Sequence, residues 1–184
     1  MRFAIFGNKH QTKKSKSIEK LFDAIVGHKD SFIIDKPFYE FLVNEGVSVP
    51  VPDGVISDDD FSADIAVSFG GAGTLLRTAS RVGRKPIPIL GINAGRLGFL
   101  TTTSNEDVDF VLEKIHNGEY CTESRSLIEV VTNGGELKNY PFALNEVAVM
   151  KHDSSSMMTL EATVNGVDKI IYRADGLIVA TPSG

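Results

Sequence analysis

The segment IAVSFGGAGTLLRTASRVG, residues 65–83, sets the pattern on which the fold is built. Its first part, Ile65–Phe69, is a short apolar run of the kind that forms a buried β-strand. A glycine-rich turn, Gly70–Gly73, follows directly. Apolar side chains then recur at helical spacing before a closing glycine, at Leu75, Leu76, Ala79 and Val82. The segment therefore predicts a strand, a tight turn and a helix in succession.

The same alternation of strand and helix occurs on both sides of this segment. Further strand-like runs lie at Arg2–Phe6, Phe32–Ile34 and Ile87–Ile92. Apolar residues at helical spacing span residues 18–25, and Pro37 is well placed to open a second helix. Strands that alternate with helices pair in parallel through right-handed crossovers. We therefore predict an α/β fold class, with an open α/β nucleotide-binding domain over residues 1–101.

The pattern changes after Leu100. One more helix is predicted, with Ser104 as its N-cap and Gly118 at its end. Strand-like segments then follow at Leu127–Val131, Ala143–Met150, Met158–Val164 and Lys169–Tyr172. Turn signals such as Asn165-Gly166 separate them. Residues 102–184 are thus predicted to form part of an all-β second domain, cut short after the apolar run Leu177–Ala180.

Composition narrows the class of protein. The 184 residues are 42% hydrophobic and contain no apolar run long enough to span a membrane, so a cytoplasmic protein without membrane contact is expected. Lys and Arg number 19 against 24 Asp and Glu, and this mixed, slightly acidic balance argues against nucleic-acid binding. Cys121 stands alone, which excludes an intrachain disulfide and agrees with a reducing compartment. No metal ligands are assigned, because the histidines are scattered along the chain.

The glycine turn is the first candidate for chemistry. Glycines at a strand-to-helix turn let backbone N–H groups approach phosphate oxygens at the positive end of the helix. The turn matches neither the G-x-G-x-x-G pattern nor a Walker A loop, which disfavours ordinary dehydrogenases and P-loop enzymes. Such turns also arise for steric reasons alone, so both interpretations stay open at this point.

Three further segments place polar residues beside apolar runs. They are GINAGRLGFL at 91–100, ALNEV at 143–147, and YRADG at 172–176 running into TPSG at 181–184. Asn145 and Glu146 interrupt an apolar strand, where unpaired polar groups are costly, so a ligand ribose or a backbone partner is expected. Arg173 and Asp175 could bind a ligand or form an ion pair at a hairpin bend.

In this order the four segments resemble the NAD kinase family. The family pattern is Gly-Gly-Asp-Gly-Thr, then Asn-x-Gly-x-Leu-Gly-Phe, then Asn-Glu, then Asp-Gly-Leu before Thr-Pro-Ser/Thr-Gly-Ser-Thr-Ala/Gly-Tyr. The resemblance implies that NAD and ATP bind between the domains, and that the ATP γ-phosphate passes to the 2'-hydroxyl of the NAD adenosine ribose. Mg²⁺ is implied by this reaction class. A homo-oligomer is implied for the full-length form.

The resemblance also implies roles for individual residues. The phosphate loop would contain Gly71, Gly73 and Thr74, with Arg77 just behind it on the helix. The NAD site would be lined by Phe99, Asn145, Glu146, Arg173, Asp175 and Ser183.

Two departures from the family pattern bear on catalysis. Ala72 occupies the position of the aspartate that orients or deprotonates the attacking hydroxyl in the family, so impaired turnover is expected, by about 10²–10⁴-fold. The family's Ser-Thr-Ala/Gly-Tyr continuation has no counterpart after Gly184. The alternatives are a non-catalytic NAD-binding pseudoenzyme, a related lipid or sugar-phosphate kinase, and a fragment without a ligand.

Overall fold

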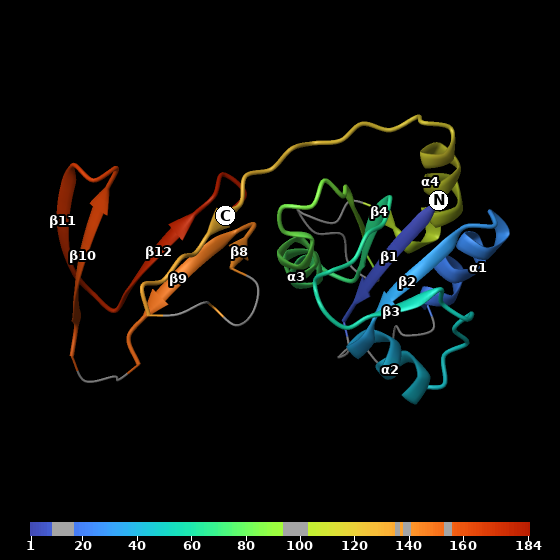
Figure 1. Cartoon of the computed structure of the whole chain (residues 1–184), viewed down its shortest axis with the longest axis horizontal. Coiled ribbons are helices and arrows are strands. Elements are labelled where there is room, and N and C mark those ends of the chain that lie inside the picture. The colour runs from blue at the N-terminus through green and yellow to red at the C-terminus, as the bar shows by residue number, and fades with distance from the viewer. Residues whose placement is uncertain (9–16, 94–102, 135–136, 138–140, 153–155) are drawn as a thin grey trace. The chain divides into compact units, whose positions relative to one another are not determined.

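A computed structural model of the chain describes residues 1–8, 17–93, 103–134, 137, 141–152 and 156–184 (Figure 1). The chain forms two compact units, Met1–Ser124 and Arg125–Gly184. None of the described helices is both long and apolar enough to cross a membrane.

The first unit is built on a six-stranded sheet with the order β3-β2-β1-β4-β5-β6. Its strands are β1 (Arg2–Gly7), β2 (Ser31–Asp35), β3 (Gly54–Ile56), β4 (Ile65–Phe69), β5 (Ile89–Asn93) and β6 (Thr103–Ser104). Every neighbouring pair is parallel, which confirms the predicted open α/β sheet. From β1 the chain adds β2 and then β3 on one side of β1, and it then adds β4, β5 and β6 on the other side. The order in which strands are added therefore reverses between β1 and β4, which are neighbours at the centre of the sheet.

Helices cover the two faces of this sheet. They are α1 (Glu19–Gly27), α2 (Lys36–Asn44), α3 (Ala72–Val82) and α4 (Val108–His116), with a 3-10 turn η2 (Asn105–Asp107) before α4. Alternate residues of a strand point to opposite faces. Phe3 and Ile5 accordingly join a large buried cluster with α1, α2 and α4, whereas Ala4 and Phe6 join a smaller one with Val82 of α3.

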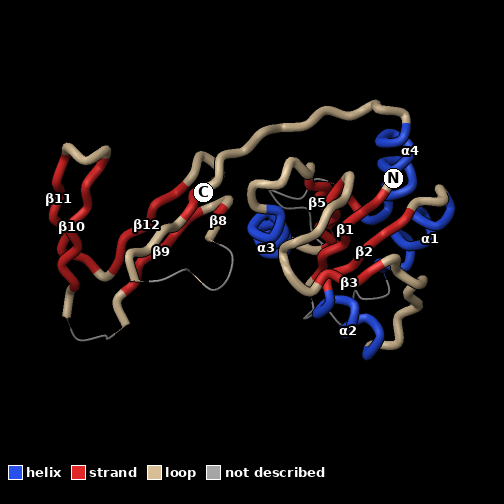
Figure 2. Tube along the Cα trace, in the orientation of Figure 1, coloured by secondary structure: helices blue, strands red, loops and turns tan. Residues whose placement is uncertain are grey.

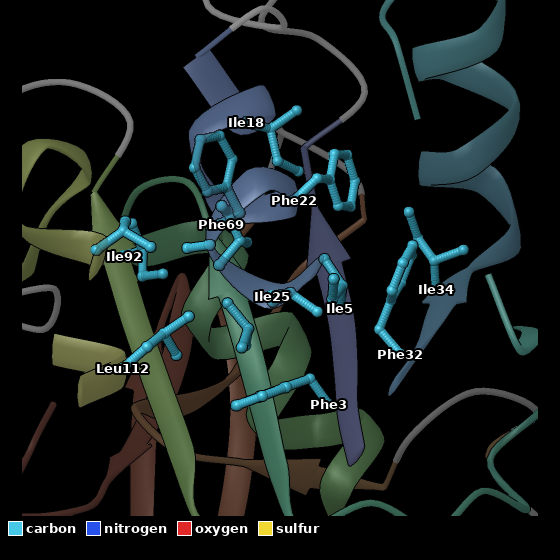
Figure 3. Close-up of a cluster of buried hydrophobic side chains, with 14 of the residues drawn as sticks. Phe3, Ile5, Ile18, Phe22, Ile25, Phe32, Ile34, Phe69, Ile92 and Leu112 are labelled. Atoms are coloured by element: carbon cyan, nitrogen blue, oxygen red, sulfur yellow. The ribbon is translucent and has the colours of Figure 1, made fainter. Parts of the chain in front are cut away.

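The larger cluster supplies most of the core of this unit. Figure 3 shows Phe3, Ile5, Phe22 and Leu112 among its side chains, contributed by strands and helices far apart in the sequence. Each of these four is at most 1% exposed. Full burial of one such side chain stabilises the fold by about 1.5–3 kcal/mol.

Helix α4 belongs to the first unit. The predicted second domain begins at residue 102 and would include α4, but the compact units divide after Ser124. The physical reason is its apolar stripe: Val108, Leu112 and Ile115 are buried in the same cluster as the α1 side chains. Ser104 does act as an N-cap, because its hydroxyl accepts a hydrogen bond from the N–H of Glu106, although it caps η2, which leads into α4.

The second unit contains only β-strands and connecting segments among its described residues (Figure 2). The strands are β7 (Ile128–Glu129), β8 (Phe142–Ala143), β9 (Glu146–Met150), β10 (Met158–Val164), β11 (Asp168–Ala174) and β12 (Gly176–Ala180). They pair antiparallel as β7–β8, β9–β12 and β10–β11. The predicted Asn165-Gly166 turn joins β10 to β11, with φ of 52° and 72° at the two residues, as a tight hairpin turn requires.

Candidate functional site

The carboxyl edge of the parallel sheet offers a site between β1 and β4. These strands are neighbours, and Gly7 at the end of β1 is paired in register with Phe69 at the end of β4. The helices that follow them, α1 and α3, pack on opposite faces of the sheet. Ligands of open α/β sheets bind in the crevice outside the carboxyl ends of strands at such a reversal point.

The glycine turn lies at this edge, and its first glycine is sterically required. Gly70 has a φ of 156°, and a Cβ atom there would lie 2.4 Å from Oγ1 and 2.9 Å from Cβ of Thr74. Its N–H donates a hydrogen bond to the carbonyl of Ile92, 2.9 Å away, which ties the turn to β5. The close packing of Thr74 on Gly70 therefore holds the turn in one conformation.

The rest of the turn forms the N-terminal end of α3. Gly71 is the N-cap, and its carbonyl accepts hydrogen bonds from the N–H groups of Thr74 and Leu75. The N–H groups of the first two helical residues, Ala72 and Gly73, have no carbonyl acceptor within the helix. Ala72 and Gly73 are exposed, so their backbone faces solvent at the positive end of the helix dipole. This arrangement can bind an anion such as a phosphate group.

Two buried hydroxyl groups near the turn have no hydrogen-bond partner among the described residues. They are Oγ of Ser68, in a residue that is 0% exposed, and Oγ1 of Thr74, in a residue that is 3% exposed. Buried polar groups are nearly always paired.

The described residues contain few clustered candidates for binding a metal ion through side chains. None of them forms a group of three or more His, Cys, Asp or Glu side chains that could hold a metal ion. The glycine turn carries a methyl group at Ala72, where a carboxylate would be needed to bind a cation.

Two arginines on α3 have different environments. Arg77, predicted to lie behind the phosphate loop, is exposed on α3. Arg81, which sequence analysis did not single out, is 11% exposed at its side chain and donates hydrogen bonds to three groups. Its Nη1 lies 2.7 Å from Oδ1 of Asp35, and its Nε lies 2.5 Å from Oδ1 of Asp59. Its Nη2 lies 2.8 Å from the carbonyl oxygen of Asp58. Arg81 thus connects α3 to the end of β2 and to the loop after β3.

A titratable cluster lies at the opposite, amino edge of the sheet. The ring of His116 stacks on that of His28, and its Nδ1 lies 2.7 Å from the carbonyl oxygen of Leu112. Its Nε2 lies 3.1 Å from Oδ1 of Asp30, whose carboxylate also pairs with the N-terminal ammonium group of Met1. The carbonyl of Leu112 and then the carboxylate of Asp30 raise the pKa of His116. This cluster contributes to stability rather than to the glycine-turn site.

In the second unit, the TPSG turn at residues 181–184 folds onto the segment that contains Asn145. The N–H of Thr181 donates to the carbonyl of Asn145, 2.8 Å away, and its Oγ1 donates to the carbonyl of Leu144, 2.6 Å away. Gly184 packs so closely that a Cβ atom there would lie 2.4 Å from the carbonyl oxygen of Asn145. Two of the predicted NAD-site segments, including Asn145 and Ser183, are therefore neighbours in space.

These bonds also correct one predicted strand. The sequence pattern predicts a continuous strand over Ala143–Met150, but β8 ends at Ala143 and β9 begins at Glu146. The carbonyl groups of Leu144 and Asn145 accept hydrogen bonds from Thr181, and the chain bends there. Local propensity could not show this, because the partner lies far along the chain.

The other predicted residues of the second unit are exposed. Glu146 is the first residue of β9, opposite Ala180 of β12. Arg173 lies on β11 opposite Thr159. Asp175 forms an ion pair with Nζ of Lys151 at 2.6 Å, in place of the ion pair between Arg173 and Asp175 considered from the sequence.

Some predicted features lie outside the described residues. Phe99 and most of its segment fall in residues 94–102, which the structure does not describe. Asn93, which begins that part of the motif, is 5% exposed at the end of β5. The structure thus groups Gly71, Gly73 and Thr74, with Arg77 on the same helix, in the first unit. Asn145 and Ser183 come together in the second.

Comparison with known proteins adds an independent assignment. Residues 8–120 match the family model described as ATP-NAD kinase N-terminal domain. A protein named NAD kinase from Bacteroides fragilis is 42% identical over 184 residues, covering 100% of this chain and 63% of the relative. A protein of the same name from Porphyromonas gingivalis is 37% identical over 183 residues, with the same coverage of 100% and 63%. The chain therefore spans a little under two thirds of the length of these relatives.

A solved structure shares the fold. Yeast NADH kinase, crystallised in complex with NADH, superposes with a TM-score of 0.80 and 18% sequence identity, covering 100% of this chain and 58% of that chain. At this level of identity the likeness concerns the fold alone. Because the family model matches more than half of its residues, this chain belongs to the NAD kinase family.

Proposed function

We propose that the protein transfers the γ-phosphate of ATP to the 2'-hydroxyl of the adenosine ribose of NAD, forming NADP. The observation that carries this proposal is the N-terminal end of α3. There the exposed backbone of Ala72 and Gly73 and the unpartnered hydroxyl of Thr74 lie at the reversal point of the sheet. Relatives named NAD kinase, at 42% and 37% identity over essentially the whole chain, support the choice of substrate.

The phosphate groups would bind at the glycine turn. The N–H groups of Gly71 and Gly73 would donate hydrogen bonds to phosphate oxygens, and the helix dipole would favour their negative charge. Thr74 would support the turn from beneath Gly70. Arg77 would add positive charge from the exposed face of the same helix. Mg²⁺ would enter with the nucleotide and offset the charge of the transferred phosphate.

Residues of the second unit would bind the dinucleotide. Asn145 and Ser183 are the leading candidates, because the TPSG turn brings them together. Phe99, Glu146, Arg173 and Asp175 remain assigned to this site by the family resemblance. A cytoplasmic homo-oligomer is part of the same proposal.

Ala72 limits what this chain can catalyse. Its methyl group occupies the first position of α3 and can neither accept a proton nor orient a hydroxyl. Its backbone N–H still donates, so nucleotide binding is expected to persist while phosphoryl transfer is slow. This residue is also the reason to keep a second candidate function, that of a non-catalytic NAD-binding protein.

Restoring the carboxylate tests both candidates. Position 72 is exposed at a helix N-terminus, where an aspartate is accommodated and stabilised by the dipole. With ATP, Mg²⁺ and NAD present, Ala72→Asp is expected to form NADP about 10²–10⁴ times faster than the natural chain. Ala72→Asn is the matched control, because asparagine is similar in size to aspartate but cannot accept a proton. It should increase the rate of NADP formation only slightly.

The outcomes separate the two candidates. A folded Ala72→Asp variant that binds NAD and ATP but forms no NADP would contradict the kinase assignment. Rapid NADP formation by the natural chain would instead exclude the non-catalytic function and show that the carboxylate is dispensable here.

A further inference from the structure

A positively charged side chain contacts the TPSG turn in the second unit. Nη1 of Arg125 donates a hydrogen bond to Oγ of Ser183, 3.1 Å away. The N–H of Ser183 in turn donates to Oγ1 of Thr181, also at 3.1 Å, and that hydroxyl donates to the carbonyl of Leu144. Arg125 therefore joins a series of hydrogen bonds that continues through Ser183 and Thr181 into the segment containing Asn145.

The bond from Arg125 constrains what the hydroxyl of Ser183 can do. A serine hydroxyl has one hydrogen to donate and two positions at which to accept. The guanidinium group of Arg125 occupies one accepting position of the Ser183 hydroxyl. Among the described residues, the hydrogen of this hydroxyl has no acceptor. Ser183 is half-buried, so its hydroxyl is both oriented and accessible. This geometry leaves the hydroxyl ready to donate a hydrogen bond to a ligand.

We propose that Arg125 is a positioning residue of the dinucleotide site, which orients the hydroxyl of Ser183 as a hydrogen-bond donor to an acceptor atom of NAD. The proposal rests on the proposed function, because it takes NAD as the ligand of the TPSG turn. Arg125 acts through Ser183 and needs no contact with the ligand itself. A charge-assisted hydrogen bond suits this role, since it is stronger and more directional than a neutral one.

A different role for the same cation would be general attraction of the phosphates of the dinucleotide. That effect needs no serine at position 183 and weakens as salt is added, because Arg125 is exposed. Positioning depends on Ser183 and is less sensitive to salt. A double-mutant cycle over the two residues distinguishes the two roles.

The test is a calorimetric titration of the chain with NAD for the natural chain and for Arg125→Met, Ser183→Ala and the double variant. Methionine keeps much of the apolar stem of arginine and removes its charge and donors. Each single change is expected to weaken NAD binding about three- to tenfold, the effect of one ordinary hydrogen bond. The double variant should bind no more weakly than the weaker of the two singles.

Lys169→Met is the matched control. It removes one positive charge from the same unit, but Lys169 pairs with Glu161 across the β10–β11 hairpin at 2.9 Å. A change of less than about twofold is expected, as for an exposed surface ion pair. Arg125→Lys is a second variant that keeps the charge and a donor, and it should recover part of the affinity. Far-ultraviolet circular dichroism and thermal unfolding check that each variant is folded.

The possible results distinguish failure of the proposed function from failure of the role of Arg125. If the natural, folded chain does not bind NAD, the proposed function is overturned for this chain and the role of Arg125 with it. If the natural chain binds NAD and Arg125→Met binds equally well, only the role of Arg125 is overturned. Positioning through Ser183 would also be overturned if the double variant lost NAD affinity by the product of the two single-variant factors. The same holds if Arg125→Lys bound NAD as weakly as Arg125→Met.

Discussion

The Arg81 network gives the sharpest prediction about stability. We expect Arg81→Met to destabilise the first unit by about 3 kcal/mol, because it leaves the carboxylate of Asp35 without its ion-pair partner. The two side chains are 11% and 12% exposed, so removal of the cation leaves an uncompensated charge in a poorly hydrated position. Methionine retains apolar contact with Phe6, over which the guanidinium lies at 5.5 Å from the ring centroid. The loss therefore reports the polar network rather than the packing.

Companion variants test where that free energy comes from. Asp59 is 43% exposed at its side chain, so Asp59→Asn should cost less than about 1 kcal/mol. Replacing Asp35 by leucine in the Arg81→Met background should recover much of the loss, because the unpaired carboxylate causes most of it. The assay is urea unfolding followed by far-ultraviolet circular dichroism, since the described helices all lie in the first unit. A loss below about 1 kcal/mol for Arg81→Met would refute the reasoning.

Three further predictions concern the turns and the pH dependence of stability. The raised pKa of His116 means that its stabilising contribution is complete below its ordinary pKa of 6.5 and is lost as pH rises through the folded-state value; His116→Gln should remove this part of the pH dependence of urea unfolding. Lys29 has a φ of 58°, so Lys29→Gly should raise the free energy of unfolding by about 0.5–1 kcal/mol, and a loss would contradict the left-handed conformation. Gly70→Ala should lower the free energy of unfolding by about 1–3 kcal/mol, because the added Cβ clashes with Thr74. Gly73→Ala should be neutral or slightly stabilising, because a Cβ there meets no atom within 4 Å. Equal effects of the two variants in calorimetric unfolding would argue against the described turn.

The parallel sheet could be predicted because its signals are local. Each strand is a short apolar run, and each helix of the first unit shows apolar residues at helical spacing. The alternation of the two then limits the topology to parallel pairing. The glycine turn of residues 70–73 could be placed at the end of a strand for the same reason, since strand, turn and helix follow one another directly along the chain.

Features that depend on distant partners could not be read in the same way. The apolar stripe of α4 predicted a helix but not the surface it covers, and the cluster it shares with α1 decides the unit to which it belongs. The bend at Leu144 and Asn145 depends on Thr181. Arg81 and Arg125 have partners that lie 22 to 58 residues away in sequence, and no spacing rule connects them.

The central claim is that the N-terminal end of α3 binds the phosphate groups of a nucleotide. The most direct test is a nuclear magnetic resonance titration of the chain with ATP and Mg²⁺, following the backbone amides of Gly71, Ala72 and Gly73. We expect these amides to shift together and saturate with ATP, and Gly70→Ala to weaken the binding. Saturable ATP binding that leaves these three amides unchanged, or no binding by the folded chain, would contradict it.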